Sequence, residues 1–369
     1  MKFRSLILFL SLFCISSIYS QTLEGYIYDK LSEKPLSGAT VYIDGTTISS
    51  STNEDGYFKI NGSGNKNSVL VVSFVGYITS RIENPFQYKK IKTFLDEDLI
   101  TMAEVVIGKS IFTRKSMLKA FRENFLGTSE AGLSCKIENE DDINLFFDEE
   151  TKTLSATSRT PLKVINKNLG YEVFFDLVDF SVEYNEAKLS PFYVRKSSFA
   201  GTSFYKDISK SKKAAKKRQE SFLGSATHLM MTIANESWQK EKFGLYVDRF
   251  PVDPKEYFKV KDTLGVKKVT LVKEPVKNTP IYKMHVGEID FKNPIQPEII
   301  GYEDKKVNFN ILYDGKKQSV ADFLEKEFIV DENGNYSPVY LAFFGGYLGT
   351  QKLGDMLPSD YYQTIKGKY

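Results

Sequence analysis

The residues with the clearest potential for chemistry lie close together, between positions 218 and 228. Ser225 and His228 stand three positions apart there, and a serine hydroxyl beside a histidine base is a pair that hydrolases use for nucleophilic attack. Residues three apart share one face of an α-helix, so the two side chains could form a hydrogen bond. The same spacing also fits a pair that only satisfies nearby polar groups. A hydrolase site near Ser225 and His228 is therefore one alternative.

Basic residues dominate the stretch just before this pair. A solvated helix face is the simplest interpretation, and binding to acidic lipid headgroups or anionic glycans is the other. The whole chain has 50 basic and 47 acidic residues, a net charge of +3, so its charge gives no reason to expect a nucleic-acid partner. The basic residues are Lys210, Lys212, Lys213, Lys216, Lys217 and Arg218. The candidate binding residues are Arg218, Ser225, His228, Lys212 and Lys213.

Two acidic runs, residues 138–142 and 148–150, flank an apolar stretch at 143–147. Paired carboxylates invite comparison with a glycosidase or a calcium site. Neither run has the Asp-x-Asx-x-Asx-Gly pattern of a calcium loop. An edge strand with charged, solvated flanks explains them better.

Other catalytic and metal-binding motifs are incomplete in this sequence, because residues that they require are missing. The stretch 103–110 resembles a phosphate-binding loop, but Ala103 stands where the first glycine is needed. The chain has only two histidines, His228 and His285, which cannot build a histidine-rich zinc site. Cys135 lies in a strand-like stretch without a nearby activating residue, so we expect an inert, buried thiol. We therefore expect no catalytic activity, no metal and no cofactor.

The candidate residues would be positioned by one long helix, predicted over residues 206–239. An apolar stripe at helical spacing begins in its second half. The Gly224–Ser225 pair would cost about 1 kcal/mol relative to alanine inside a helix, unless another backbone packs closely there. The first half should face solvent and the second half should be buried. The stripe consists of Phe222, Ala226, Leu229, Met230 and Ile233.

The rest of residues 110–369 alternates between strand-like segments and turns. A helix is predicted over 110–126, with Gly127 able to end it. Strand patterns follow at 162–165, 171–178, 244–247, 269–272, 309–313 and 328–330. These patterns predict a β-rich α+β domain over residues 110–369.

The N-terminus has the pattern of a secretory signal peptide. Lys2 and Arg4 precede an apolar run at 6–18, and Ser20 stands at the expected cleavage point. The run is too short to span a membrane comfortably. A membrane anchor and lipid attachment at Cys14 are the alternatives. We expect a signal peptide over 1–20, no membrane span in the mature chain, and export to the periplasm, outer membrane or cell surface.

Short alternating strands dominate residues 22–107. Leu23, Gly25 and Ile27 point to one side of the first strand, and Tyr26 and Tyr28 point to the other. Glycines at turn positions separate the later strands, and an apolar run at 69–75 fits a central strand. Several short strands with regular turn signals predict an all-β sandwich.

These residues resemble the carboxypeptidase-regulatory-like module of exported Bacteroidetes proteins. The resemblance implies a seven-stranded Greek-key, prealbumin-like sandwich, and thus a mainly β protein with some α structure. In many relatives the module precedes a TonB-dependent outer-membrane barrel, for which this chain has no room after residue 107. The module does not contain the catalytic zinc site of carboxypeptidases. The matching stretches are 25–29, 35–41, 45–46, 52–58, 73–77 and 104–106.

A second resemblance concerns five residues within the predicted long helix, which are similar to a recurring signature in the larger domain of such proteins. This signature has no assigned activity. The residues are Arg218, Phe222, Gly224, Ser225 and His228.

Together these observations predict an exported, non-enzymatic envelope protein that uses its sandwich for binding or assembly. Its partner would be an envelope protein or a glycan. A role as accessory to an outer-membrane TonB-dependent system is a further alternative.

Overall fold

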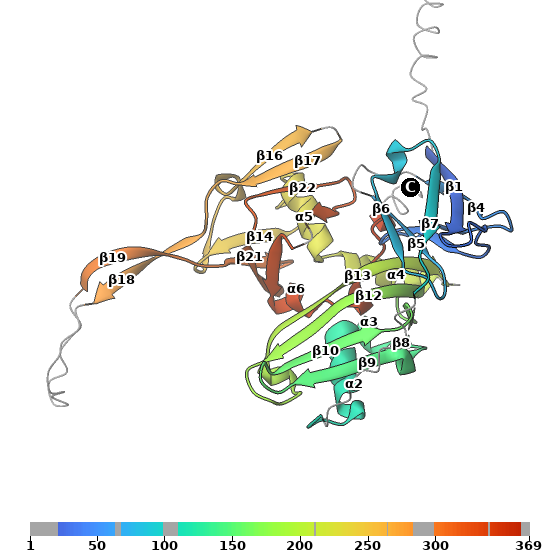
Figure 1. The fold of residues 1–369 in the computed structure, drawn as a ribbon. Coiled ribbons are helices and arrows are strands. Elements are labelled where there is room, and N and C mark those ends of the chain that lie inside the picture. The colour runs from blue at the N-terminus through green and yellow to red at the C-terminus, as the bar shows by residue number, and fades with distance from the viewer. Residues whose placement is uncertain are drawn as a thin grey trace, which may run out of the picture. The chain divides into compact units, whose positions relative to one another are not determined.

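A computed structural model of the chain describes residues 21–62, 68–98, 110–209, 212–263, 265–282, 299–338 and 340–362 (Figure 1). The chain divides into two compact units. The N-terminal unit comprises the residues up to Val106 together with Thr202–Phe204, and the C-terminal unit comprises Ile107–Gly201 and Tyr205–Tyr369. The predictions for the signal peptide, for the loop-like stretch at 103–109 and for His285 lie outside the described residues.

The N-terminal unit contains two β-sheets with one core. Leu23 and Ile27 are sealed on the inner face of the first strand, while Tyr26 and Tyr28 are half-buried on its outer face. One sheet has the strand order β4-β1-β7 and the other β3-β2-β5-β6. The bounds are β1 (Gln21–Asp29), β2 (Thr40–Ile43), β3 (Ser49–Ser51), β4 (Tyr57–Gly62), β5 (Val69–Ser73), β6 (Ser80–Glu83), η1 (Pro85–Gln87) and β7 (Ile91–Leu95).

These strands confirm the predicted sandwich and the mainly β class of the chain. The first strand pairs antiparallel with β4 and parallel with β7. Gly25 lies where β1 meets both neighbours. A Cβ atom there would collide with the backbone of Ile91 and the ring of Phe58, so only glycine allows this close packing.

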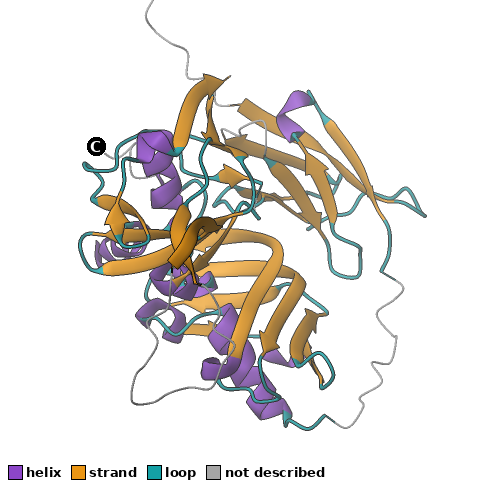
Figure 2. Cartoon of the chain, turned by 90° about the vertical axis from the view of Figure 1, so that its left-hand side faces the viewer, coloured by secondary structure: helices purple, strands orange, loops and turns teal. Residues whose placement is uncertain are grey.

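The first half of the C-terminal unit is a six-stranded sheet with a helix against it (Figure 2). The central strand is the long β12, and the strand order is β8-β11-β12-β10-β9 with β13 also paired to β12. Phe121 and Phe125 of α2 pack against Phe180 and Phe175 of the sheet. The bounds are α2 (Arg114–Phe125), α3 (Glu130–Leu133), β8 (Cys135–Ile137), η2 (Glu140–Asp142), β9 (Ile143–Asp148), β10 (Thr153–Ser158), β11 (Leu162–Asn166), β12 (Tyr171–Tyr184), η3 (Pro191–Tyr193) and β13 (Val194–Asp207).

The second half of the C-terminal unit packs two further sheets around a short helix, α5. Leu229, Met230 and Ile233 of this helix are buried against Phe258 and Phe309. The sheets have the orders β15-β14-β20-β21-β24 and β16-β17-β22-β23. The bounds are α4 (Lys212–Phe222), α5 (Ala226–Ala234), β14 (Phe243–Val247), β15 (Phe250–Pro251), η4 (Pro254–Glu256), β16 (Phe258–Thr263), β17 (Val266–Leu271), β20 (Phe309–Tyr313), β21 (Lys317–Phe323), β22 (Glu327–Val330), β23 (Tyr336–Ser337), β24 (Ala342–Gly345), α6 (Gly346–Thr350) and η5 (Leu353–Asp355).

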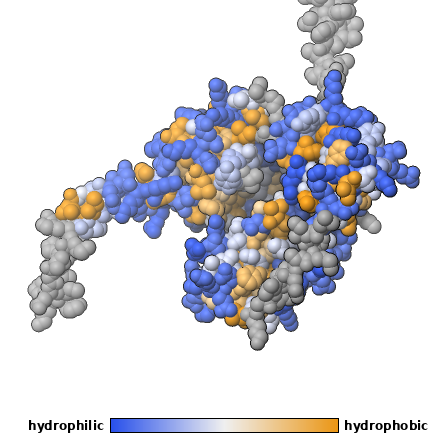
Figure 3. Space-filling model, in the orientation of Figure 1, coloured by the Kyte–Doolittle hydropathy of each residue, from blue (hydrophilic) through white to orange (hydrophobic). Residues whose placement is uncertain are grey.

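A two-stranded ribbon, β18 (Val276–Tyr282) with β19 (Ile299–Lys306), extends from the second half (Figure 1). Figure 3 shows hydrophobic residues near its end, where Ile299 and Ile300 are 47% and 60% exposed. Lys277 and Lys306 form ion pairs with Asp248 and Asp322 at its base. In the part of the chain that the structure describes, no helix is long and apolar enough to cross a membrane.

The chain returns to the first half at η5 and so ties the two halves together. Gly354 donates its backbone N–H to the carbonyl of Leu126 at 3.0 Å, and Asn166 donates its side-chain amide to the carbonyl of Gly354 at 2.8 Å. The Ser129 hydroxyl donates to Asp355 at 2.7 Å. A side chain at Gly354 would collide with Gly132, so this contact depends on glycine.

The predicted single helix over 206–239 is wrong, because the chain forms two helices there, α4 and α5. Gly224 lies between them with a φ of +84°, a left-handed conformation that ends a right-handed helix. The expected burial pattern is present only in part, because Arg218 and Ala214, in the half that was expected to face solvent, are buried. Lys212 and Lys213 are exposed on α4, while Leu229 and Ile233 of α5 are sealed.

Candidate functional site

Arg218 anchors α4 to the six-stranded sheet. Its guanidinium donates to both carboxylate oxygens of Asp207, each at 2.8 Å, and to the carbonyl oxygens of Leu169 and Gly170 at 2.7 and 3.0 Å. The group also lies 3.7 Å from the centre of the Tyr171 ring. Arg218 holds the pKa of the Asp207 carboxyl well below its usual range. Because its donors are used inside the protein, Arg218 acts as a structural clamp.

The turn between α4 and α5 explains the Gly-Ser pair of the sequence. Gly224 packs against Tyr313, whose ring would collide with any Cβ atom at position 224. Ser225 is the N-cap of α5, and its hydroxyl accepts the backbone N–H of His228 at 3.1 Å. Such a cap satisfies one of the free N–H groups at the start of a helix. The pair therefore makes a sharp turn against a neighbouring strand.

His228 closes the same turn from inside the core. Its side chain is buried, and Nδ1 accepts the backbone N–H of Gly224 at 3.0 Å. Nε2 must then carry the proton, and it donates to Glu241 at 3.1 Å. Burial lowers the pKa of His228, although the Glu241 carboxylate acts in the opposite direction. The imidazole is thus held neutral between two fixed partners.

This geometry gives no support to the hydrolase hypothesis. The Ser225 hydroxyl is bonded to the backbone of His228 and not to its imidazole. Both ring nitrogens have partners of their own, Gly224 and Glu241. A nucleophile needs a base within hydrogen-bond reach of its own oxygen. Here the Ser225 hydroxyl and the His228 imidazole bind different backbone N–H groups of the same turn.

Lys212 and Lys213 lie in the first turn of α4, where their side chains are exposed. Neither forms an ion pair with another described residue. Lys217, one turn later, pairs with Glu130 at 3.0 Å and Glu220 at 3.3 Å. The structure thus separates the predicted site residues: Arg218 and His228 are buried and Ser225 is half-buried, while Lys212 and Lys213 remain open to an anionic ligand.

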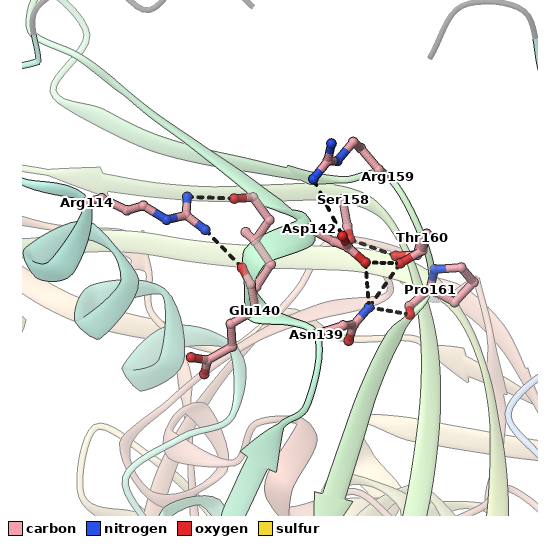
Figure 4. A network of polar contacts seen from close by, with 9 residues as sticks. Arg114, Asn139, Glu140, Asp142, Ser158, Arg159, Thr160 and Pro161 are labelled. Atoms are coloured by element: carbon pink, nitrogen blue, oxygen red, sulfur yellow. Dashed lines mark hydrogen bonds and ion pairs between the residues drawn. The ribbon is translucent and has the colours of Figure 1, made fainter. Parts of the chain in front are cut away.

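The first acidic run is part of a network of polar contacts around η2 (Figure 4). Asp142 accepts hydrogen bonds from Thr160 and Asn139 and lies 3.5 Å from Arg159. Arg114 donates to the carbonyl oxygens of Glu140 and Ile143. The hydrogen bonds from Thr160 and Asn139 lower the pKa of Asp142, which is the opposite of what a general acid requires.

The same run offers no metal site. The Glu140 carboxylate is bound by the guanidinium of Arg122. Among the described residues, no three histidine, cysteine, aspartate or glutamate side chains come together to hold a metal ion. Cys135 is half-buried, and desolvation raises the pKa of its thiol to about 12 and keeps it protonated.

An aromatic surface covers the outer face of the β4-β1-β7 sheet. We call it the tyrosine face, and its rings lie in contact: Tyr26 is 5.4 Å from Tyr57 and 6.2 Å from Tyr28, which is 5.6 Å from Phe94. Lysine ammonium groups lie over these rings at 4.5–5.0 Å. The tyrosine face consists of Tyr26, Tyr28, Tyr57, Lys90, Lys92 and Phe94.

Comparison with known proteins bears on the N-terminal unit. The family model of the CarboxypepD_reg-like domain matches residues 23–107. These residues form a CarboxypepD_reg-like domain. This family is a regulatory, non-catalytic module. Among curated proteins the search finds no match.

Several solved structures show limited similarity to the chain. A type II cohesin–X-dockerin complex from Acetivibrio cellulolyticus is 30% identical over 20% of this chain and 52% of that one, with a TM-score of 0.18. A 9R-lipoxygenase from Cyanothece is 10% identical over 58% and 48%, with a TM-score of 0.18. A protein of unknown function from Bacteroides fragilis is 13% identical over 51% and 81%, with a TM-score of 0.16. The chain spans about half the length of the cohesin–dockerin chain that it matches.

The tyrosine face of the CarboxypepD_reg-like domain was only partly visible in the sequence. The alternation of Tyr26 and Tyr28 with sealed residues places both rings on one face. Their meeting with Tyr57 and Phe94 depends on which strands pair beside β1, and sequence alternation does not fix strand order. A search for aromatic residues at outward positions of all the strands would have found these residues. It would not have shown that their rings lie in contact with one another.

Proposed function

We propose that this protein is an exported, non-enzymatic protein of the bacterial cell envelope. Its CarboxypepD_reg-like domain binds an acidic region of another envelope protein through the tyrosine face. The family of the domain supports a non-catalytic role. The leader-like pattern at residues 1–20 supports export.

The observation that carries this proposal is a row of exposed or half-exposed rings with lysines stacked over them. Lys90 and Lys92 are exposed and form no ion pair with another described residue. Clustered aromatic residues are enriched where proteins meet, because they bury a large area at little entropic cost. Because Lys90 and Lys92 lack acidic partners, they would repel a basic surface of a binding partner and attract an acidic one.

A lysine–carboxylate coupling experiment tests whether the tyrosine face binds an acidic partner. Carbodiimide treatment of intact cells should join Lys90 or Lys92 to an acidic residue of a partner, and peptide mass spectrometry should locate the bond. The double substitution Lys90→Gln/Lys92→Gln should remove the adduct. Lys115→Gln, at an exposed lysine on α2, is the matched control and should leave it unchanged. Absence of an adduct at these lysines, or its survival in the double variant, would reject the tyrosine face as the binding surface.

Export is tested separately on the native protein. Purified protein should begin at Gln21 and should fractionate with the envelope. An intact Met1, or recovery from the cytosol alone, would contradict export.

A further inference from the structure

The second half of the C-terminal unit contains a cavity of about 710 Å³. It lies between the C-terminal end of α5, the β14–β15 hairpin, η4 and the start of β16. Its volume is within the usual range for small-molecule sites, which runs from roughly 300 to 1,000 Å³.

Four aromatic residues, Trp238, Phe243, Tyr246 and Phe258, line the cavity. Trp238, the single tryptophan of the chain, stacks on Phe258 at an interplanar angle of 25°. Trp238 is 8% exposed, and its indole N–H has no hydrogen-bond acceptor among the described residues. A ligand oxygen in the cavity can provide the acceptor that a mostly buried indole normally finds.

Tyr246 lies along the wall because the neighbouring position on its face of β14 is a glycine. A Cβ atom at Gly244 would lie 2.9 Å from Cε2 of Tyr246 and 3.2 Å from its hydroxyl oxygen. The Tyr246 ring therefore folds over Gly244, and both residues line the cavity. The ring adds a further aromatic surface to the cavity wall.

The rim is polar, and its charges balance. Glu236, Gln239, Lys240 and Lys255 are exposed lining residues. Asp253 uses Oδ1 to accept the N–H of Lys255 at 3.0 Å. Its Oδ2, like the side chains of Glu236 and Gln239, has no hydrogen-bond partner among the described residues. These groups can accept and donate hydrogen bonds without favouring a charged ligand.

We propose that this cavity binds a neutral saccharide. Aromatic walls suit the apolar faces of sugar rings, and uncommitted carboxylate and amide groups suit their hydroxyls. A phosphorylated ligand would need a cluster of cations, whereas here the two lining lysines, Lys240 and Lys255, are balanced by two lining carboxylates, Glu236 and Asp253. The proposal does not depend on the tyrosine face, which lies in the other unit.

The sole tryptophan provides a direct test. Tryptophan fluorescence of the full-length mature chain is titrated with maltohexaose, cellohexaose, xylohexaose and chitohexaose. We expect at least one neutral oligosaccharide to change the emission saturably, and calorimetry to confirm binding with little dependence on salt. No response to any of the four sugars at 10 mM, or tighter binding of polygalacturonate that weakens with salt, would overturn the proposal.

Variants then place the binding in the cavity. Tyr246→Ala should weaken binding by about tenfold or more, as expected for an aromatic contact. Gly244→Ala should also weaken it, because the new methyl group displaces the Tyr246 ring. Tyr282→Ala, at a tyrosine on the β18–β19 ribbon that is 52% exposed, is the matched control and should bind normally. Circular dichroism establishes that each variant is folded, and unchanged binding by a folded Tyr246→Ala protein would overturn the assignment.

Discussion

Gly224 donates its backbone N–H to Nδ1 of His228 at 3.0 Å, and so the imidazole accepts a bond from the turn that begins its own helix. Protonation of Nδ1 would put two donors face to face. The ring is also surrounded by Phe222, Phe243 and Tyr313 at 5.1–5.6 Å. The turn between α4 and α5 is therefore built for a neutral histidine.

This relationship predicts that stability falls in acid. The pKa of His228 is lowered from 6.5 in the folded protein, so the unfolded chain binds a proton first as the pH falls. The contribution of the neutral ring is complete above pH 6.5 and is lost below it, by at most about 1.4 kcal/mol per pH unit until the folded pKa is reached. Urea unfolding between pH 8 and 5 measures this.

His228→Asn is the informative variant for that experiment, because its side-chain oxygen can replace Nδ1 as an acceptor but does not titrate. The variant should be less stable than the parent at pH 8 and should lose less stability between pH 7 and 5. An equal loss in both proteins would show that other groups cause the acid sensitivity.

Gly224→Ala should destabilise the C-terminal unit by more than about 1 kcal/mol, because the left-handed φ strains an alanine and its Cβ meets the Tyr313 ring. Gly315→Ala separates these two causes. Gly315 also has a positive φ, +66°, but has open space around its Cβ position. Chemical denaturation should therefore give the larger loss for Gly224→Ala, and equal losses would mean that the Tyr313 contact adds nothing.

The sequence predicted the sandwich well because its strands carry their own signals. Leu23 and Ile27 alternate with Tyr26 and Tyr28, and such alternation depends on local geometry. The break at Gly224 was missed because the apolar stripe from Phe222 to Ile233 keeps a helical period across it. Gly224 was the residue that indicated the break. The need for glycine there comes from the ring of Tyr313, which lies about 90 positions away along the chain.

The candidate site was harder to predict than the fold. Arg218, Ser225 and His228 are close in the sequence, and their residue types suit chemistry. Each has a separate structural partner, and these partners, Asp207 and Glu241 among them, are identified by folding and not by spacing. The Trp238 cavity had no sequence signal, because its walls come from a loop, a hairpin and a further strand.

The two ends of the α4–α5 segment should differ in their tolerance of substitution. Phe222→Ala and Ile233→Ala should each destabilise the protein by roughly 2–5 kcal/mol, since both side chains lie in the core at 9% and 1% exposure. Lys212→Gln/Lys213→Gln should change stability by less than about 0.5 kcal/mol. Thermal and urea unfolding test both statements. Unfolding caused by the lysine changes would contradict the assignment of these residues to a solvated surface.

The final prediction concerns the clamp at Arg218. Arg218→Lys keeps the positive charge but cannot reproduce the paired bonds to Asp207 together with those to Leu169 and Gly170. We expect it to destabilise the C-terminal unit by about 2 kcal/mol or more, because buried carbonyl oxygens lose their donors. Asp207→Asn should cost less, since that side chain is half exposed and solvent can reach it. Urea unfolding of both variants distinguishes the roles, and a lysine variant as stable as the parent would show that charge alone holds α4 in place.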